Sequence, residues 1–314
     1  TMFGLFGGGK ASVKVALERT RYQPGETIPV LVTVTGEKDL NIREGRVALI
    51  CHEEYQYRYE ERRRDANGRW STHDKLEWQR AQGEAGKHVF LGEGTVRAGS
   101  SERYECNFTL PPDALPSCPN GKILRLRWAV RATLDRKMAG DIEDEAEVLV
   151  YHAPRGLSGT GPFGRSNQPE EAALSLAVPT LEWALGETIE GQLLVRPVKS
   201  FGVSEVRVEL LRVEQVHGAP DPAVSVGVHL DLGLAGKRVK GNEATQVEKV
   251  KVQGGVKLEA SQEMAFPFRI TIPTAPVTAR LHDGTVRWML KGILARTLRS
   301  DTQVEQEIVV YGAR

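Results

Sequence analysis

The stretch Arg21-Tyr22-Gln23-Pro24-Gly25-Glu26-Thr27-Ile28 recurs 161 residues later as Glu182-Trp183-Ala184-Leu185-Gly186-Glu187-Thr188-Ile189. In both places an alternating apolar pattern follows, as expected of a half-buried strand. Pro24 presets φ at the first position of a turn, and Gly25 tolerates positive φ at the next. In the second copy Leu185 stands in place of the proline, while Gly186 keeps its backbone freedom. The stretch therefore predicts the same strand-turn-strand element in each half of the chain.

Three further blocks repeat in the same order at nearly the same offset. They are residues 104–111 with 266–273, 127–134 with 287–294, and 147–151 with 307–311. Inside the second pair, Trp128 and Trp288 each begin an apolar face, and charged residues alternate with that face. A period held over four blocks indicates a tandem duplication.

Short alternating segments separated by Gly, Pro, Asn and Asp, with weak helical signals, predict an all-β chain. We expect two tandem immunoglobulin-like β-sandwich domains at residues 10–151 and 172–314. Residues 152–171 are rich in Gly and Pro and have no periodicity, so they are predicted to be the linker. Residues 1–9 are predicted to be a flexible apolar tip.

The charge balance excludes some partners. With 42 basic and 41 acidic side chains the formal net charge is +1, and neither half has the basic excess that attracts nucleic acid. Cys51, Cys106 and Cys118 lack CxxC spacing and are expected to be reduced and mostly buried. No apolar run is long enough for a membrane span, and the first residues lack the pattern of a secretory signal. We therefore expect a cytoplasmic protein.

No set of residues predicts catalysis, a metal or a cofactor. The tightest histidine cluster, His52-Glu53-Glu54, lies in a strand pattern, where neighbouring side chains point to opposite faces. The Gly-Gly-Gly-Lys run ending at Lys10 lacks the phosphate-loop pattern, and there is no Gly-x-Ser-x-Gly elbow. Cys51 and Cys106 lie in alternating apolar runs, which favours core packing over nucleophilic chemistry.

The stretch from Glu53 to Gln82 predicts a long hairpin protruding from the first sandwich. One interpretation is a solvated edge strand whose charges discourage pairing. The other is a partner-binding surface, because Tyr, Trp and Arg are enriched at interfaces. The candidate partner-binding residues are Tyr55, Tyr57, Tyr59, Arg63, Trp70 and Trp78.

The N-terminal residues Phe3, Leu5 and Phe6, flanked by glycines, form a second candidate. They could enter a groove of a partner or a membrane interface. They could equally fold under the first strand of their own sandwich.

Several of these motifs resemble the arrestin family. The residues from Tyr22 to Ile28 and the following strand are similar to the opening of an arrestin-fold domain. So are residues 108–111, which lead through a Pro/Ser loop into the strand at 126–132. The resemblance implies two immunoglobulin-like sandwiches joined by a hinge and a non-enzymatic function. Within the family, bacterial sporulation-control proteins fit better than visual or β-arrestins, whose clathrin-binding tail and polar core have no counterpart that we can place here.

The resulting hypothesis is a cytoplasmic arrestin-like scaffold that binds other proteins, without catalysis or cofactor. A peripheral membrane module that uses the N-terminal tip is the alternative. A glycan-binding sandwich that uses Trp70 and Trp78 is a third. Edge strands also make a homodimer plausible.

Overall fold

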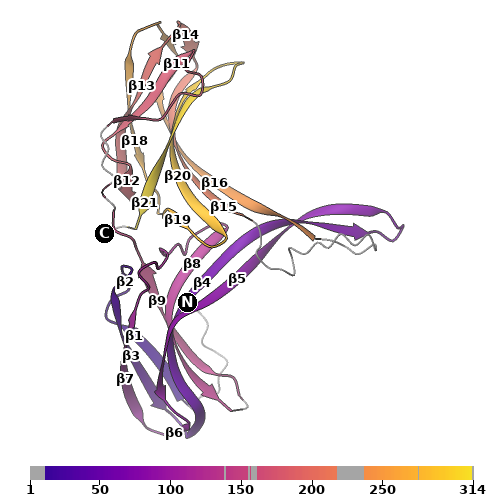
Figure 1. Ribbon diagram of the computed structural model, residues 1–314, viewed down its shortest axis with the longest axis vertical. Helices are drawn as coiled ribbons and strands as arrows, with labels where there is room; N and C mark the ends of the chain where they lie inside the picture. The colour runs from indigo at the N-terminus through magenta and orange to yellow at the C-terminus, as the bar shows by residue number, and fades with distance from the viewer. Residues whose placement is uncertain are drawn as a thin grey trace. The chain divides into compact units, whose positions relative to one another are not determined.

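The computed structural model describes residues 11–137, 139–154, 156, 161–217, 237–274 and 276–312. Every regular element in this part of the chain is a β-strand (Figure 1). The predicted all-β class is therefore confirmed. Contacts divide the chain into two compact units. Unit 1 comprises the residues up to Glu54, Arg80–Pro119 and Arg125–His152, and unit 2 comprises Tyr55–Gln79, Asn120–Leu124 and the residues from Ala153 onward.

In unit 1 an antiparallel sheet has the order β1-β3-β7, and a second group of strands lies around β8 and β9. The side chains of β3 alternate: those of Ile28, Val30, Val32 and Val34 are buried, and those between them are more exposed. The strands of the first half of the chain are β1 (Ala11–Leu17), β2 (Arg21–Tyr22), β3 (Thr27–Gly36), β4 (Leu40–Arg64), β5 (Trp70–Leu91), β6 (Gly94–Val96), β7 (Ser101–Thr109), β8 (Leu124–Arg136) and β9 (Ile142–Val150).

In unit 2 a four-stranded sheet has the order β10-β11-β13-β18, and a second sheet contains β12-β21-β20-β15-β16. One apolar core lies between them and includes Trp288, Leu193 and Phe268. The strands are β10 (Gly161–Phe163), β11 (Ala172–Val178), β12 (Glu182–Ala184), β13 (Thr188–Pro197), β14 (Phe201–Val203), β15 (Glu205–Val216), β16 (Lys237–Gln253), β17 (Val256–Leu258), β18 (Met264–Thr271), β19 (Ala279–Arg280), β20 (Gly284–Ala295) and β21 (Thr302–Tyr311).

The repeated turn has the same geometry in both units. Gly25 has φ of +83° and Gly186 has φ of +82°, which is the region that favours glycine. The Gly25 amide donates to the carbonyl of Leu110 at 3.1 Å, and the Gly186 amide donates to the carbonyl of Ile272 at 3.0 Å. The turn expected from the sequence is present in each unit.

The repeated tryptophans are also equivalent. Trp128 and Trp288 are 5% and 1% exposed. The indole Nε1 of Trp128 donates to the carbonyl of Leu115 at 2.9 Å, and that of Trp288 donates to Pro276 at 3.1 Å. A buried indole N–H needs such a partner. In each unit, therefore, the ring that fills the core also ties the preceding loop to it.

Part of the predicted linker belongs to the fold of unit 2. Gly161–Phe163 pairs antiparallel with residues 176–178 of β11, at the edge of the sheet. Pro162 has no amide to donate, and an edge strand tolerates this because its outer side needs no ladder bond. Phe163 packs against the core of unit 2. The absence of periodicity in the sequence concealed a strand of only three residues.

The distal part of the long hairpin belongs to unit 2. Figure 1 shows β4 and β5 as long curved strands that run side by side to a common turn. Strand β16 pairs antiparallel with β4, with Val239 opposite Tyr59 and Lys237 opposite Glu61. Contacts therefore group residues 55–79 with unit 2, whereas the sequence pattern indicated a protrusion from the first sandwich.

Candidate interaction surfaces

The three tyrosines of β4, here called the tyrosine stripe, are buried and do not form an exposed surface. Tyr55, Tyr57 and Tyr59 are 1%, 0% and 6% exposed. Their rings lie in a row, with centroids 6.5 Å apart for the first pair and 5.9 Å for the second. The expectation that these side chains face a partner is wrong in this fold, because the stripe packs into the protein. Period-2 alternation correctly indicated one aromatic face but not what covers it.

The turn of the hairpin is held by its own polar groups. The Asp65 carboxylate accepts bonds from the amides of Asn67 and Arg69 at 2.9 and 2.8 Å, and Gly68 takes a φ of +78°. This local pattern explains why an Asp-Ala-Asn-Gly sequence turns here. Three exposed residues flank the turn: Arg62 precedes it on β4, and Arg69 and Trp70 follow it.

Arg63 is engaged on the hairpin itself. Its Nε lies 2.6 Å from the Glu61 carboxylate, and the ammonium of Lys75 lies 2.5 Å from the same group. Hydrogen bonds from Lys75 and then Arg63 lower the pKa of Glu61 to about 2. Since this pKa is depressed, the contribution of the cluster to stability is present above the ordinary value of 4.5 and is lost as the pH falls toward 2.

The two tryptophans of the hairpin differ in accessibility. Trp70 is 48% exposed, and Leu76 on the same strand is 55% exposed, whereas Trp78 is half-buried. Large exposed apolar groups on an Arg-bearing strand are typical of a binding surface. Of the candidate residues, Trp70 and Arg63 are therefore the most accessible.

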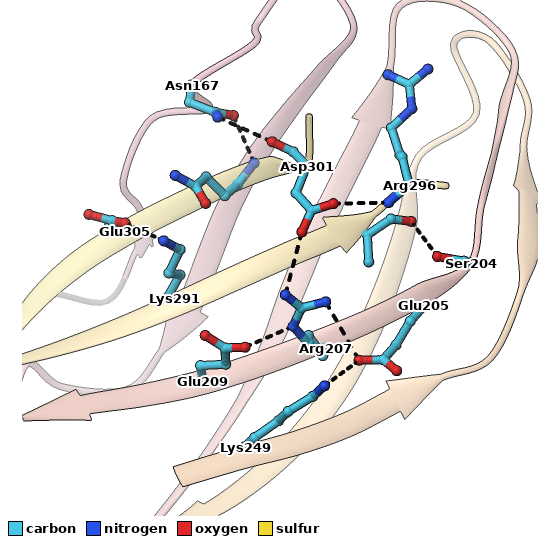
Figure 2. Close-up of polar contacts among 12 residues, drawn as sticks. Asn167, Ser204, Glu205, Arg207, Glu209, Lys249, Lys291, Arg296, Asp301 and Glu305 are labelled. Atoms are coloured by element: carbon cyan, nitrogen blue, oxygen red, sulfur yellow. Dashed lines mark hydrogen bonds and ion pairs between the residues drawn. The ribbon is translucent and has the colours of Figure 1, made fainter. Parts of the chain in front are cut away.

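The outer face of the second sheet of unit 2 carries a network of charges, which the sequence analysis did not single out. Figure 2 shows Arg207 of β15 between Glu205, Glu209 and Asp301. Its Nε lies 2.8 Å from Glu209, and its Nη2 lies 3.4 Å from Asp301. Lys249 approaches Glu205 from β16 at 3.0 Å. Three carboxylates surround one guanidinium, and the ion pairs join β15 to β16 and to the residue that precedes β21.

An ion pair of this face has a counterpart in unit 1. Lys291 lies 2.8 Å from Glu305 (Figure 2), and Arg131 lies 2.9 Å from Glu145. Both residues of the first pair follow those of the second by 160 positions. The duplication therefore includes a salt bridge between neighbouring strands as well as the core.

A buried ion pair was also missed. Glu214 is 0% exposed and Arg212 is 6% exposed, with Nη2 and Oε1 3.1 Å apart. The other oxygen of Glu214 accepts the amide of Ile123 at 2.8 Å and that of Leu124 at 3.3 Å. An Arg-x-Glu spacing inside an apolar strand was the one available signal, because it puts both charges on one strand face. The pair fastens residues 120–124 to β15.

Cys51, Cys106 and Cys118 are free thiols, as expected. Burial and then the charge of Glu53 raise the pKa of Cys51 to about 12, so it is a poor nucleophile. Burial lowers the pKa of His52, which lies 3.3 Å from Arg131. Among the described residues no group of three side chains is placed to hold a metal ion.

A shallow hollow of about 580 Å³ lies on the β1-β3-β7 sheet of unit 1. Its lining is mixed: Leu31 and Pro29 are apolar, and Glu18 and Glu105 are acidic. It contains no cluster of catalytic groups. The N-terminal candidates Phe3, Leu5 and Phe6 lie outside the described residues.

The described part of the chain contains no helix that is long and apolar enough to span a membrane.

Residues 7–155 match the family model of the arrestin (or S-antigen) C-terminal domain. The resemblance to arrestins is thereby confirmed for these residues, which make up just under half of the chain. The matching model describes the C-terminal arrestin domain, although it falls on the first half of this sequence. A search of curated proteins found no match.

Proposed function

We propose that this protein is a non-enzymatic, arrestin-like adaptor made of two tandem β-sandwich domains. It binds other proteins through the tip of the β4–β5 hairpin. The arrestin match over residues 7–155 supports an adaptor or scaffold role in general terms. The equivalent turns, tryptophans and ion pairs of the two units support a duplicated domain.

The observation that carries the proposal is the set of exposed groups at the hairpin tip. Arg62, Arg69 and Trp70 lie beside a turn that is held by Asp65, so they are presented on an ordered element. Arginine and tryptophan dominate the energetics of interfaces. The cores of the two units do not need these side chains, because each core is closed by residues elsewhere in the chain.

The finer features of the proposal follow the arrestin resemblance. We place the protein in the cytoplasm, with a regulatory role like that of bacterial sporulation-control proteins. The even charge balance supports a protein partner over a nucleic acid.

The test is affinity purification with the intact protein and with a triple variant, Arg62→Ser, Arg69→Ser and Trp70→Ser. A matched control, Arg97→Ser, Arg103→Ser and Val198→Ser, changes two arginines and one apolar residue that are exposed elsewhere. We expect partners that bind the intact protein and the control to be lost with the tip variant. Equal recovery with all three proteins would contradict the use of the hairpin tip.

A further inference from the structure

Within the part of the chain that the structure describes, no strand is paired with the outer edge of β5 in unit 2. Among the described strands its pairing partner is β4. The Asp65 amide donates to the Arg69 carbonyl at 2.9 Å at the start of this ladder. Because ladder bonds alternate along an antiparallel pair, the amides of Trp70, Thr72, Asp74 and Leu76 are directed away from β4. A row of unpaired backbone groups of this kind is a template for another strand.

The side chains along this edge are self-complementary about His73. In an antiparallel pair of two identical strands centred there, Arg69 lies opposite Glu77 of the second copy. Trp70 then lies opposite Leu76, and Thr72 opposite Asp74. Opposite residues of an antiparallel pair share a face, and both charge pairs and apolar pairs stabilise it. By symmetry each of these pairs occurs twice.

Neighbouring registers lack this match. Centring the pair on Asp74 or on Lys75 puts that charged residue opposite its own copy, and like charges in this position are destabilising. A shift to Lys75 also puts Trp70 opposite Arg80. Charge therefore favours the register centred on His73 over these two.

We propose that the protein forms a symmetric homodimer by antiparallel pairing of β5 with β5 of a second copy, centred on His73. The ordered turn at Asp65–Gly68 and the exposed Trp70 and Leu76 provide the edge and its apolar contacts. A strand pair of this length buries less surface than a standard interface. The dimer is thus expected to dissociate in the micromolar range rather than to be permanent.

The experiment is sedimentation equilibrium of the full chain from about 1 to 200 µM. The intact protein is compared with Arg69→Glu, with Glu77→Arg and with the double variant. Each single change puts like charges opposite each other twice, and we expect it to weaken the dimer about tenfold or more. The double variant restores opposite charges and is expected to recover most of the affinity. Arg103→Glu, an exposed charge change on β7, is the control and is expected to leave the dimer unchanged.

A second variant separates strand pairing from electrostatics. Thr72→Pro removes an outward amide without removing a ladder bond to β4, and we expect it to weaken the dimer while circular dichroism shows a folded protein. Monomer throughout the concentration range for the intact protein would overturn the proposal. A dimer that is indifferent to both single charge changes would also overturn it.

Discussion

The two units are alike in the repeated sequence blocks and differ in structure mainly outside them. The turns at Gly25 and Gly186, the indoles of Trp128 and Trp288, and the strand-to-strand ion pairs are almost interchangeable. The Tyr-, Trp- and Arg-rich sequence of the β4–β5 hairpin lies outside the repeated blocks. Features common to both units are those that close a sandwich, and features present in one unit are the places to seek function. The following changes test that division.

The largest effect is expected at the tryptophans. Trp288→Ala and Trp128→Ala each remove a large core side chain, at a cost of about 3–5 kcal/mol in the free energy of unfolding. Phenylalanine at either position should cost less than alanine, because an aromatic ring still fills part of the core. It should still cost more than no change, because the hydrogen bond to the carbonyl of Pro276 or Leu115 is lost. Urea unfolding followed by circular dichroism measures these differences. Losses below about 1 kcal/mol in one unit would break the equivalence.

The next effect is expected at Glu214. Removing one partner of a buried ion pair leaves the other charge uncompensated, so Glu214→Ala should cost about 3 kcal/mol. Glu53, which lies 161 positions earlier, is also buried, at 7% exposure. The same substitution there tests whether a buried acid is a shared feature of these strands. Glu305→Ala is the control, because its side chain is 41% exposed and it should change stability by about 0.5 kcal/mol or less.

The sequence predicted the burial of some residues and not of others. The difference lies in whether the contacts that bury a residue come from its own strand or from residues far away in the sequence. Trp128 was predictable because a period-2 pattern reports a core face through its own neighbours. The burial of Tyr59 was not, because Val239 opposite it is far away in the sequence. Glu214 was hidden for the same reason: the amides that it accepts belong to Ile123 and Leu124.

A smaller effect is expected at the repeated turns. A side chain at positive φ is strained, so Gly25→Ala and Gly186→Ala should each cost about 1–2 kcal/mol. At neither position would a Cβ atom meet a neighbour within 4 Å, so the cost is conformational alone. Gly83→Ala is the matched control, since its surroundings are equally open and its φ is not positive. Thermal unfolding of the three variants should show similar losses for the two turns and little change for the control.

The smallest effect is expected at the repeated ion pairs. Both pairs are partly exposed, and such pairs contribute about 0.2–1 kcal/mol. Arg131 donates to Glu145 from Nε and Nη2, at 3.0 and 2.9 Å, whereas Lys291 approaches Glu305 with one ammonium. Double-mutant cycles to alanine should therefore give a larger coupling energy for the arginine pair, and salt should reduce both. If Arg131→Lys lowers the coupling to that of the second unit, the guanidinium accounts for the difference. If the coupling is unchanged, the two copies are equivalent at this position despite their different side chains.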